Sequence, residues 1–216
     1  MSQAHVNVGA DQIWSQIFDT AHRFSSPRPA LFLDRDGVIV EEVHYLHKVE
    51  DVKLIDGAAA LIAKANAQDI PVIVVTNQSG LARQMFGWDE FDAVQARMLD
   101  LLKSETGAFV DGVYACPFHK SGHPPFVHPD HEARKPNPGM LLRALDVFPI
   151  DKGASWIIGD KAGDLKAGKN AGLCGGVHVL TGHGRDEGET ENAQSLASST
   201  FNVRMENSIK DALDLF

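Results

Sequence analysis

The sequence has few cysteines, no long apolar run and no excess of positive charge, and each shortage excludes a class of protein. Its 216 residues include 2 cysteines, which excludes a disulfide scaffold and favours a reducing, cytoplasmic location. Apolar runs such as 70–75 are far shorter than the roughly 20 residues of a membrane span, so we expect no membrane contact. A formal net charge of −9 argues against non-specific nucleic-acid binding, although it permits a small anionic substrate.

Short apolar runs alternate with amphipathic segments through most of the chain. The apolar runs, which predict strands, are 30–33, 71–75, 110–115, 155–158 and 175–180. The segments with helical spacing are 57–67, 88–103, 138–147 and 165–171, and a late helix is expected at 208–215. Strands that are apolar throughout and separated by helices predict a doubly wound α/β fold, a parallel sheet with helices on both faces.

Residues 30–216 are interpreted as one domain that contains a flap and a His-rich loop. Residues 1–29 are interpreted as an N-terminal helical extension, with Asp11 as N-cap and an apolar stripe at Ile13, Ile17, Phe18, Ala21 and Phe24. Two irregular stretches have a length typical of functional loops, a flap at 41–52 and a His-rich loop at 116–138. Residues 182–199 are expected to form a solvated loop with some local helix. No insertion is long enough for a large cap domain.

Two carboxylates, Asp34 and Asp36, directly follow the first predicted strand and are separated by one residue. Extended backbone sends alternate side chains to the same side, so both carboxylates are expected to face one way. One of them can attack phosphorus while the other exchanges a proton with the leaving oxygen. Taken alone, the segment is equally typical of a surface turn rich in Asp and Gly.

Matching polar groups accompany the later strands in order. Thr76 offers a hydroxyl to phosphate oxygens, Lys135 a cation for phosphoryl charge, and Asp160 an oxygen ligand for Mg²⁺. Taken singly, these residues are better explained as a turn, a solvated lysine and a helix cap. Their joint occurrence near the carboxyl ends of strands, where ligands bind in such sheets, favours a phosphate-handling site.

The ordered motifs resemble those of a known enzyme superfamily. They are LDRDGVI (33–39), TNQSG (76–80), RKP (134–136) and GDKAGD (159–164). Over residues 29–180 the chain resembles the haloacid dehalogenase (HAD) superfamily of phosphatases. The fuller strings are similar to its branch of D,D-heptose 1,7-bisphosphate phosphatases and histidinol-phosphate phosphatases.

This resemblance implies a Mg²⁺-dependent phosphomonoesterase with a covalent intermediate. Asp34 would attack phosphorus to give an aspartyl-phosphate, while Asp36 would protonate the leaving alkoxide and then activate water. Mg²⁺ would be held by Asp34, the backbone carbonyl of Asp36, and Asp160. Asp164 would not bind the metal directly and would instead contact the groups around it.

The resemblance also implies the substrate contacts. Phosphoryl oxygens would be stabilised by Thr76 and Lys135, and further substrate contacts would come from Arg35, Glu42, Tyr45, Asn77, Gln78, Ser79, Arg134 and Lys161. The implied substrate is a small phosphorylated metabolite, D-glycero-D-manno-heptose 1,7-bisphosphate, with histidinol phosphate or another sugar phosphate as the alternative. Without a large cap to exclude water, hydrolysis is favoured over phosphoryl transfer.

The His-rich loop departs from that branch, whose zinc-bearing members carry Cys-x-His and then Cys-x-Cys before Arg-Lys-Pro. Phe118 and Ala133 stand at two of those ligand positions here. A shifted set with a spacing compatible with tetrahedral Zn²⁺ consists of Cys116, His119, His128 and His131. The alternative is a loop of solvated, hydrogen-bonded histidines without metal.

Two other classes of protein share parts of this pattern. A receiver domain of a signalling protein also phosphorylates an Asp at a strand end, but it lacks the paired acids at 34 and 36. A catalytically inactive protein that binds phosphate esters is disfavoured because every catalytic position is filled. A monomer is expected, since an amphipathic stripe such as that at 13–24 more often packs on its own domain.

Overall fold

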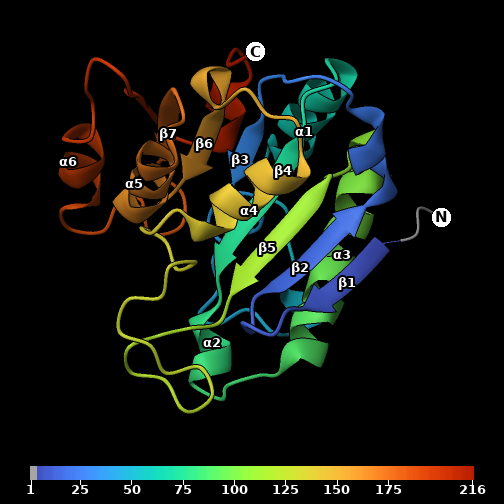
Figure 1. Ribbon diagram of the computed structural model, residues 1–216, viewed down its shortest axis with the longest axis vertical. Helices are drawn as coiled ribbons and strands as arrows, with labels where there is room; N and C mark the ends of the chain where they lie inside the picture. Colours follow the sequence, from blue (N-terminus) through green and yellow to red (C-terminus); the bar gives the residue numbers. More distant parts are fainter. Residues whose placement is uncertain (1–3) are drawn as a thin grey trace.

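A computed structural model describes residues 4–216, which form one eight-stranded sheet (Figure 1). The spatial order of the strands is β1-β2-β5-β4-β3-β6-β7-β8. Their bounds are β1 Ala4–Val8, β2 Trp14–Phe18, β3 Leu31–Leu33, β4 Val72–Asn77, β5 Gly112–Cys116, β6 Trp156–Gly159, β7 Gly175–Val179 and β8 Asn202–Glu206. Neighbouring strands from β5 through β8 in that order are parallel, whereas β1 and β2 add an antiparallel edge.

Helices cover both faces of this sheet. They are α1 Ala58–Ala67, α2 Ser79–Ala82, α3 Trp88–Thr106, α4 Gly139–Val147, α5 Ala162–Ala171 and α6 Glu189–Gln194, with 3-10 helices at Asp19–Arg23, Val49–Asp51, Lys152–Ala154 and Ile209–Ala212. In Figure 1, α4 and α5 lie in front of the sheet, and α1 and α3 lie behind it. The predicted doubly wound α/β architecture is confirmed.

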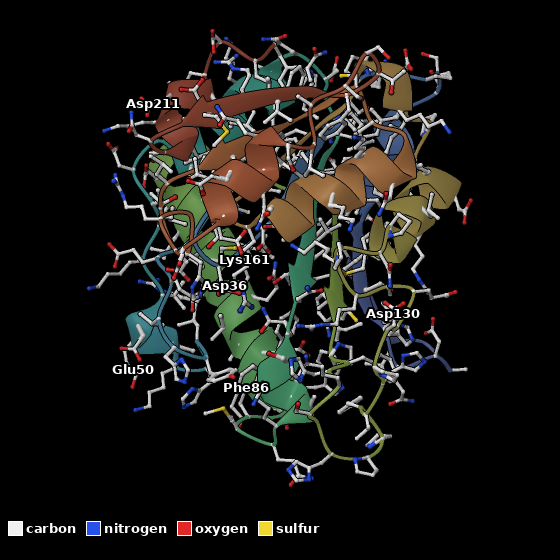
Figure 2. The ribbon with its side chains drawn as sticks, turned by 90° about the vertical axis from the view of Figure 1, so that its left-hand side faces the viewer. Asp36, Glu50, Phe86, Asp130, Lys161 and Asp211 are labelled. Carbon is white, nitrogen blue, oxygen red and sulfur yellow. The ribbon has the colours of Figure 1, made fainter. Side chains whose placement is uncertain are left out.

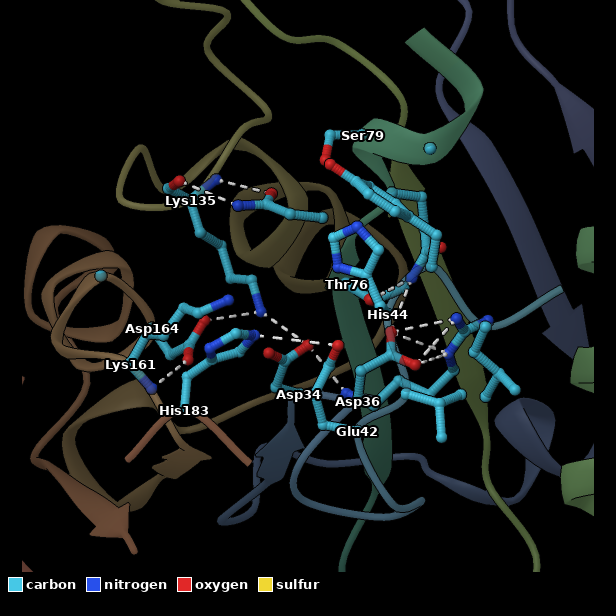
Figure 3. Close-up of a pocket in the computed structure, with 18 of the residues that line it drawn as sticks. Asp34, Asp36, Glu42, His44, Thr76, Ser79, Lys135, Lys161, Asp164 and His183 are labelled. Carbon is cyan, nitrogen blue, oxygen red and sulfur yellow. Dashed lines mark hydrogen bonds and ion pairs between the residues drawn. The ribbon is translucent and has the colours of Figure 1, made fainter. Parts of the chain in front are cut away.

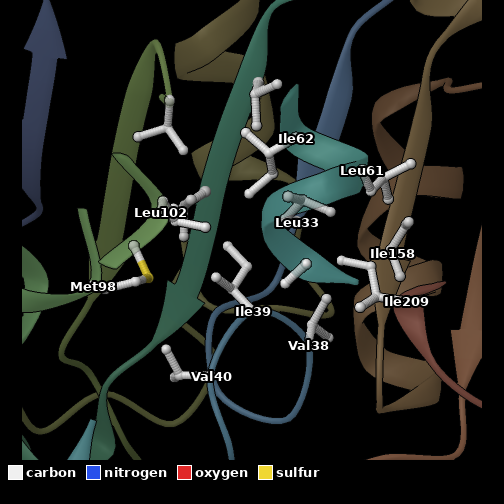
Figure 4. Close-up of a cluster of buried hydrophobic side chains, with 14 of the residues drawn as sticks. Leu33, Val38, Ile39, Val40, Leu61, Ile62, Met98, Leu102, Ile158 and Ile209 are labelled. Atoms are coloured by element: carbon white, nitrogen blue, oxygen red, sulfur yellow. The ribbon is translucent and has the colours of Figure 1, made fainter. Parts of the chain in front are cut away.

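Strand β3 shows why the central strands are apolar throughout. Leu31 and Leu33 belong to the core under α1 and α3, where Ile62 and Met98 also pack (Figure 4). Phe32 points the other way, into the core under α4 and α5. With both faces buried, polar side chains are tolerated only past the strand's end, at the carboxyl edge of the sheet.

The central elements match their predicted positions. The differences lie at the ends of individual helices and in the last third of the chain. Helix α5 begins at Ala162, three residues before the predicted start, and α3 runs on to Thr106. The helix expected at 208–215 is only a 3-10 turn, Ile209–Ala212. Strand β8 was not predicted, whereas α6 falls in the segment expected to hold some local helix.

The prediction of an N-terminal helix was wrong. Its residues 1–3 lie outside the described residues, and from residue 4 the chain forms the β1–β2 hairpin followed by the 3-10 helix Asp19–Arg23. Asp11, expected as a helix N-cap, lies in the hairpin turn, where its carboxylate accepts a hydrogen bond from the Ile13 amide at 3.3 Å. Strand β2 pairs with β5, and these backbone hydrogen bonds override a helical spacing that only local propensity supports.

A buried ion pair fastens this N-terminal segment to the sheet. Asp111, just before β5, is fully buried and pairs with Arg23. The same carboxylate accepts a hydrogen bond from the Val72 amide at 2.9 Å. Breaking a buried pair leaves an uncompensated charge, so this contact holds the hairpin firmly against β5 and the start of β4.

The connection between β3 and α1 carries no domain-size insertion. It contains the flap, which is closed at its base by the isolated bridge between Val40 and Leu54.

Helices within residues 4–216 are all too short or too polar to cross a membrane.

Candidate active site

The polar residues predicted to act together meet at the carboxyl edge of the sheet. They border a pocket of about 360 Å³ formed by the loops after β3, β4, β6 and β7 and by the loop before α4. Figure 2 shows Asp36 and Lys161 near the centre of this edge, between Glu50 of the flap and Asp130 of the His-rich loop. Predicted site residues on this pocket are Asp34, Arg35, Asp36, Glu42, Tyr45, Thr76, Asn77, Gln78, Ser79, Arg134, Lys135, Lys161 and Asp164.

A glycine turn after β3 brings the first acidic loop against β6. Gly37 has φ +80°, which glycine adopts without strain, and its amide donates to the Val40 carbonyl at 2.8 Å. A side chain at Gly37 would collide with the carboxylate of Asp160. Thr181, after β7, donates from its hydroxyl to the Gly37 carbonyl at 2.6 Å. The turn therefore needs glycine both for its conformation and for the close approach of Asp160.

Lys135 lies between two carboxylates at the floor of the pocket (Figure 3). Its Nζ is 2.9 Å from Asp34 Oδ1 and 2.7 Å from Asp164 Oδ1, and it donates to the Val75 carbonyl at 2.7 Å. Burial alone would lower the pKa of Lys135, but the Asp164 and Asp34 charges outweigh it and raise that pKa. The ammonium group is held charged and immobile beside the predicted nucleophile.

Negative charge at this floor exceeds what Lys135 neutralises. Oxygens of Asp34, Asp160 and Asp164 all lie within 4.8 Å of one another. Burial raises the pKa of Asp34 to about 6, with Lys135 opposing the shift, and raises that of Asp160 to about 8 with help from the Asp34 charge. Asp160 Oδ1 is buried and has no hydrogen-bond partner among residues 4–216. This donor set fits a hard divalent cation such as Mg²⁺, which prefers carboxylate oxygens.

Asp164 differs from the other two acids because both of its oxygens have partners. Oδ1 pairs with Lys135 and Oδ2 accepts the Lys161 amide at 3.0 Å. It lies in the first turn of α5, where that second contact also caps the helix. The outer position of Asp164 stays a prediction.

Asp36 is held by two neighbouring side chains. Arg35 donates to its carboxylate from Nε and Nη2 at 3.0–3.2 Å, and Gln78 Nε2 donates to Oδ2 at 2.8 Å. Gln78 also donates to Thr76 Oγ1 at 2.9 Å. Arg35 is 1% exposed and its guanidinium lies over the Phe91 ring, so it fixes Asp36 in place. The substrate contact of Arg35 stays a prediction.

Asn77, whose substrate contact stays a prediction, joins two segments of the pocket wall. Its amide donates to the Lys135 carbonyl at 3.0 Å and accepts from the Lys135 amide at 3.1 Å. These paired bonds join the end of β4 to the loop that carries Lys135. Asn77 therefore fixes the position of Lys135, while Ser79 borders the open part of the pocket.

The outer wall of the pocket comes from the flap and from cationic side chains. Burial and the nearby Asp36 charge raise the pKa of Glu42. The Arg134 guanidinium donates to the Phe118 carbonyl at 2.8 Å, which ties it to the His-rich loop. Two histidines of this wall, His44 and His183, were missed from the sequence. His183 follows β7, so the rule that singled out polar residues after each strand would have found it.

The predicted zinc site does not form among these residues. Of Cys116, His119, His128 and His131, no three bring donor atoms within 4.8 Å of one another, although all four are described. Instead, each imidazole Nδ1 accepts a hydrogen bond from a backbone amide two residues further along the chain, at 3.0–3.1 Å. The pairs are His119 with Ser121, His128 with Asp130, and His131 with Ala133. The His131 ring stacks on Phe118, with centroids 3.9 Å apart. The loop is closed by these local contacts.

Comparisons with known proteins agree with this geometry. The HAD-hydrolase-like family model matches residues 132–200. A D-glycero-beta-D-manno-heptose-1,7-bisphosphate 7-phosphatase of Mesorhizobium japonicum is 51% identical over 148 residues, 68% of each chain. The enzyme of that name from Rhodopseudomonas palustris is 44% identical over 70% of this chain and 84% of its own.

Solved structures are similar over most of the chain. A protein of Mesorhizobium loti named as a HAD-like phosphatase has a TM-score of 0.82 and 40% identity, and the match covers 94% of this chain and 92% of that one. The D,D-heptose 1,7-bisphosphate phosphatase of B. bronchiseptica, solved with magnesium and phosphate, has a TM-score of 0.69 and 29% identity. That match covers 87% of this chain and 97% of the other.

Proposed function

Because the chain belongs to the HAD phosphatases, in the family of the D-glycero-D-manno-heptose-1,7-bisphosphate 7-phosphatases, we propose that it hydrolyses the 7-phosphate of a heptose 1,7-bisphosphate. One observation carries this proposal: Asp34, Lys135 and Asp160 meet at the floor of a pocket above which Asp36 is held by its own hydrogen bonds. This arrangement would surround a phosphoryl group with a nucleophile, a cation and an acid.

The chemistry follows from the two acids after β3. Asp34 attacks phosphorus through a carboxylate oxygen, and the bond between phosphorus and the sugar oxygen breaks as the aspartyl-phosphate forms. Asp36 gives its proton to the leaving alkoxide. It then takes a proton from the water that attacks the aspartyl-phosphate and releases inorganic phosphate. Hydrogen bonds from Arg35 and Gln78 hold the Asp36 carboxylate in position during both steps.

Mg²⁺ would be held by Asp34, the backbone carbonyl of Asp36, and Asp160, with Asp164 anchoring Lys135 behind them. The cation would offset the repulsion between an anionic nucleophile and an anionic substrate. The unpartnered Asp160 Oδ1 supports this assignment. Thr76 and Lys135 stabilise the phosphoryl oxygens.

The rest of the substrate would lie against the outer wall. Glu42 and Tyr45 of the flap are placed to contact sugar hydroxyls, and Arg134 and Lys161 to neutralise the distal phosphate. Residues 4–216 contain no large cap over this wall, which leaves space for a sugar bisphosphate and access for water. A monomeric state and a cytoplasmic location stay predictions.

A phosphate-release assay with a panel of esters tests the proposed substrate. With Mg²⁺ present, we expect kcat/KM for heptose 1,7-bisphosphate to exceed that for histidinol phosphate, hexose phosphates and nucleotides by at least about tenfold. This expectation reflects the extra charge-assisted contacts of a distal phosphate. Chelation by EDTA should abolish turnover, and added Mg²⁺ should restore it. A preference for histidinol phosphate or for a nucleotide would overturn the assigned substrate.

Stability without Mg²⁺ should fall as the pH rises from 5 to 8.5. The raised pKa values of Asp34 (about 6) and Asp160 (about 8) mean that the folded chain binds more protons than the unfolded chain in this range. Each extra proton lowers the unfolding free energy by up to about 1.4 kcal/mol per pH unit. Because Mg²⁺ favours the ionised acids, it should raise the Tm more at pH 8.5 than at pH 5.

Calorimetry at both pH values, in EDTA and in Mg²⁺, measures this effect. Asp160→Asn is the matched control, since its neutral amide removes one titration and one predicted ligand. In EDTA its Tm should rise relative to that of the parent as the pH increases. Equal stabilisation by Mg²⁺ at the two pH values would contradict the proposed ligand set.

A further inference from the structure

His183 lies on the pocket wall but has no part in the chemistry described above. It follows β7 in the loop 180–188, and its backbone amide donates to Asp160 Oδ2 at 2.8 Å. Its imidazole borders the pocket and is 38% exposed (Figure 3). The hydrogen bond to Asp160 fixes the position of the His183 backbone, and the imidazole faces the pocket.

Asp186 fixes the orientation of the imidazole. His183 Nδ1 is 2.7 Å from Asp186 Oδ2. A carboxylate only accepts hydrogen bonds, so Nδ1 carries a proton in this contact. The other ring nitrogen, Nε2, is left to face the pocket. Carboxylates orient histidine rings in the same way at other functional sites.

Across the pocket, Nε2 faces a carboxylate. Glu42 Oε1 of the flap is 3.8 Å from Nε2, which is too long for a direct hydrogen bond. Both groups therefore keep capacity for a third partner. The charges of Asp36 and Asp34 both act on Glu42, which places this pair of groups close to the reacting acids.

We propose that His183 is a specificity-determining residue that, with Glu42, forms hydrogen bonds with two hydroxyls of the leaving sugar near the transferred phosphate. Two facing hydrogen-bonding groups suit a vicinal diol, and they leave an ester without hydroxyls unrecognised. The inference rests on the proposed phosphatase function. It extends to any polyol phosphate and does not require heptose bisphosphate itself.

The experiment compares two kinds of phosphate ester. Heptose 1,7-bisphosphate and glycerol 3-phosphate carry hydroxyls beside the phosphate, whereas p-nitrophenyl phosphate carries none. His183→Ala should lower kcat/KM for the polyol esters about tenfold more than for p-nitrophenyl phosphate, chiefly through KM, because one hydrogen bond to substrate is lost. His183→Gln, which keeps an acceptor on a chain of similar reach, should recover part of the preference.

Two further variants separate substrate contact from a structural role. Asp186→Ala frees the ring and should reduce the preference by about threefold, whereas Arg185→Ala, an exposed change in the same loop, should leave kinetics unchanged. Equal losses on all esters in His183→Ala would overturn the inference and assign the residue to loop structure. Unaltered kinetics in that variant would overturn it as well.

The activity of the parent enzyme on the different esters separates an error in the proposed substrate from an error in the inference about His183. If the parent enzyme ignores heptose bisphosphate yet hydrolyses other polyol phosphates, only the assigned substrate falls, and the effect of His183→Ala on those esters still decides the inference. If the parent hydrolyses no ester with Mg²⁺ present, both the function and the inference are overturned.

Discussion

Asp34→Asn is expected to reduce Mg²⁺-dependent phosphate release by more than about a thousandfold while the protein stays folded. An amide cannot attack phosphorus, so the covalent route closes and only binding and charge stabilisation remain. The fold should survive because burial and the neighbouring acids already oppose the ionised form of Asp34. Lys135 meanwhile keeps Asp164 as its partner.

Steady-state kinetics on the preferred ester and a thermal melt in EDTA measure both parts of this expectation. Asp100→Asn, a change of the same kind at an exposed position of α3, controls for the loss of one negative charge. Turnover near the parent rate in Asp34→Asn would remove Asp34 as the nucleophile. A collapsed melt would show that Asp34 is needed for folding.

Lys135→Met should combine loss of activity with a large loss of stability. The side chain is 1% exposed and sits between Asp34 and Asp164, so its removal leaves two buried carboxylates without their cation. Breaking a buried pair in this way costs about 3–5 kcal/mol of unfolding free energy. Urea denaturation should show that loss, and phosphate release should fall because phosphoryl charge is no longer neutralised.

Neutralising an acid beside the missing lysine tests whether charge is the cause. Lys135→Met with Asp164→Asn should be more stable than Lys135→Met alone, since fewer uncompensated charges stay buried. Lys120→Met, at an exposed position of the His-rich loop, should change unfolding free energy by less than about 0.5 kcal/mol. No recovery in the double variant would mean that packing, and not charge, explains the loss.

The parts predicted best from the sequence are those in which local pattern and tertiary environment agree. β3 is apolar throughout because both of its faces are buried, and Asp34 follows it because the carboxyl edge is where polar groups are admitted. Parallel strands bring their carboxyl ends together. The meeting of Asp34 with Thr76 and Asp160 was therefore predictable from their order alone.

The predictions that failed depended on contacts that the apolar pattern does not show. Ile13 and Ile17 have helical spacing, but the open edge of β5, far away in the sequence, offered hydrogen bonds that no local pattern reveals. In the His-rich loop, the imidazoles of His119, His128 and His131 accept backbone amides two residues on, and they do not gather around one position for a metal.

The antiparallel β2 strand has a consequence for the behaviour of the protein in concentrated solution. β5 is buried along its whole length, and as the last strand of the sheet it would present an apolar, unpaired backbone to other molecules. Such edges template intermolecular pairing and aggregation. By pairing with β5 and being held there through Arg23 and Asp111, β2 covers the apolar edge at which β5 would otherwise favour fibre-like self-association.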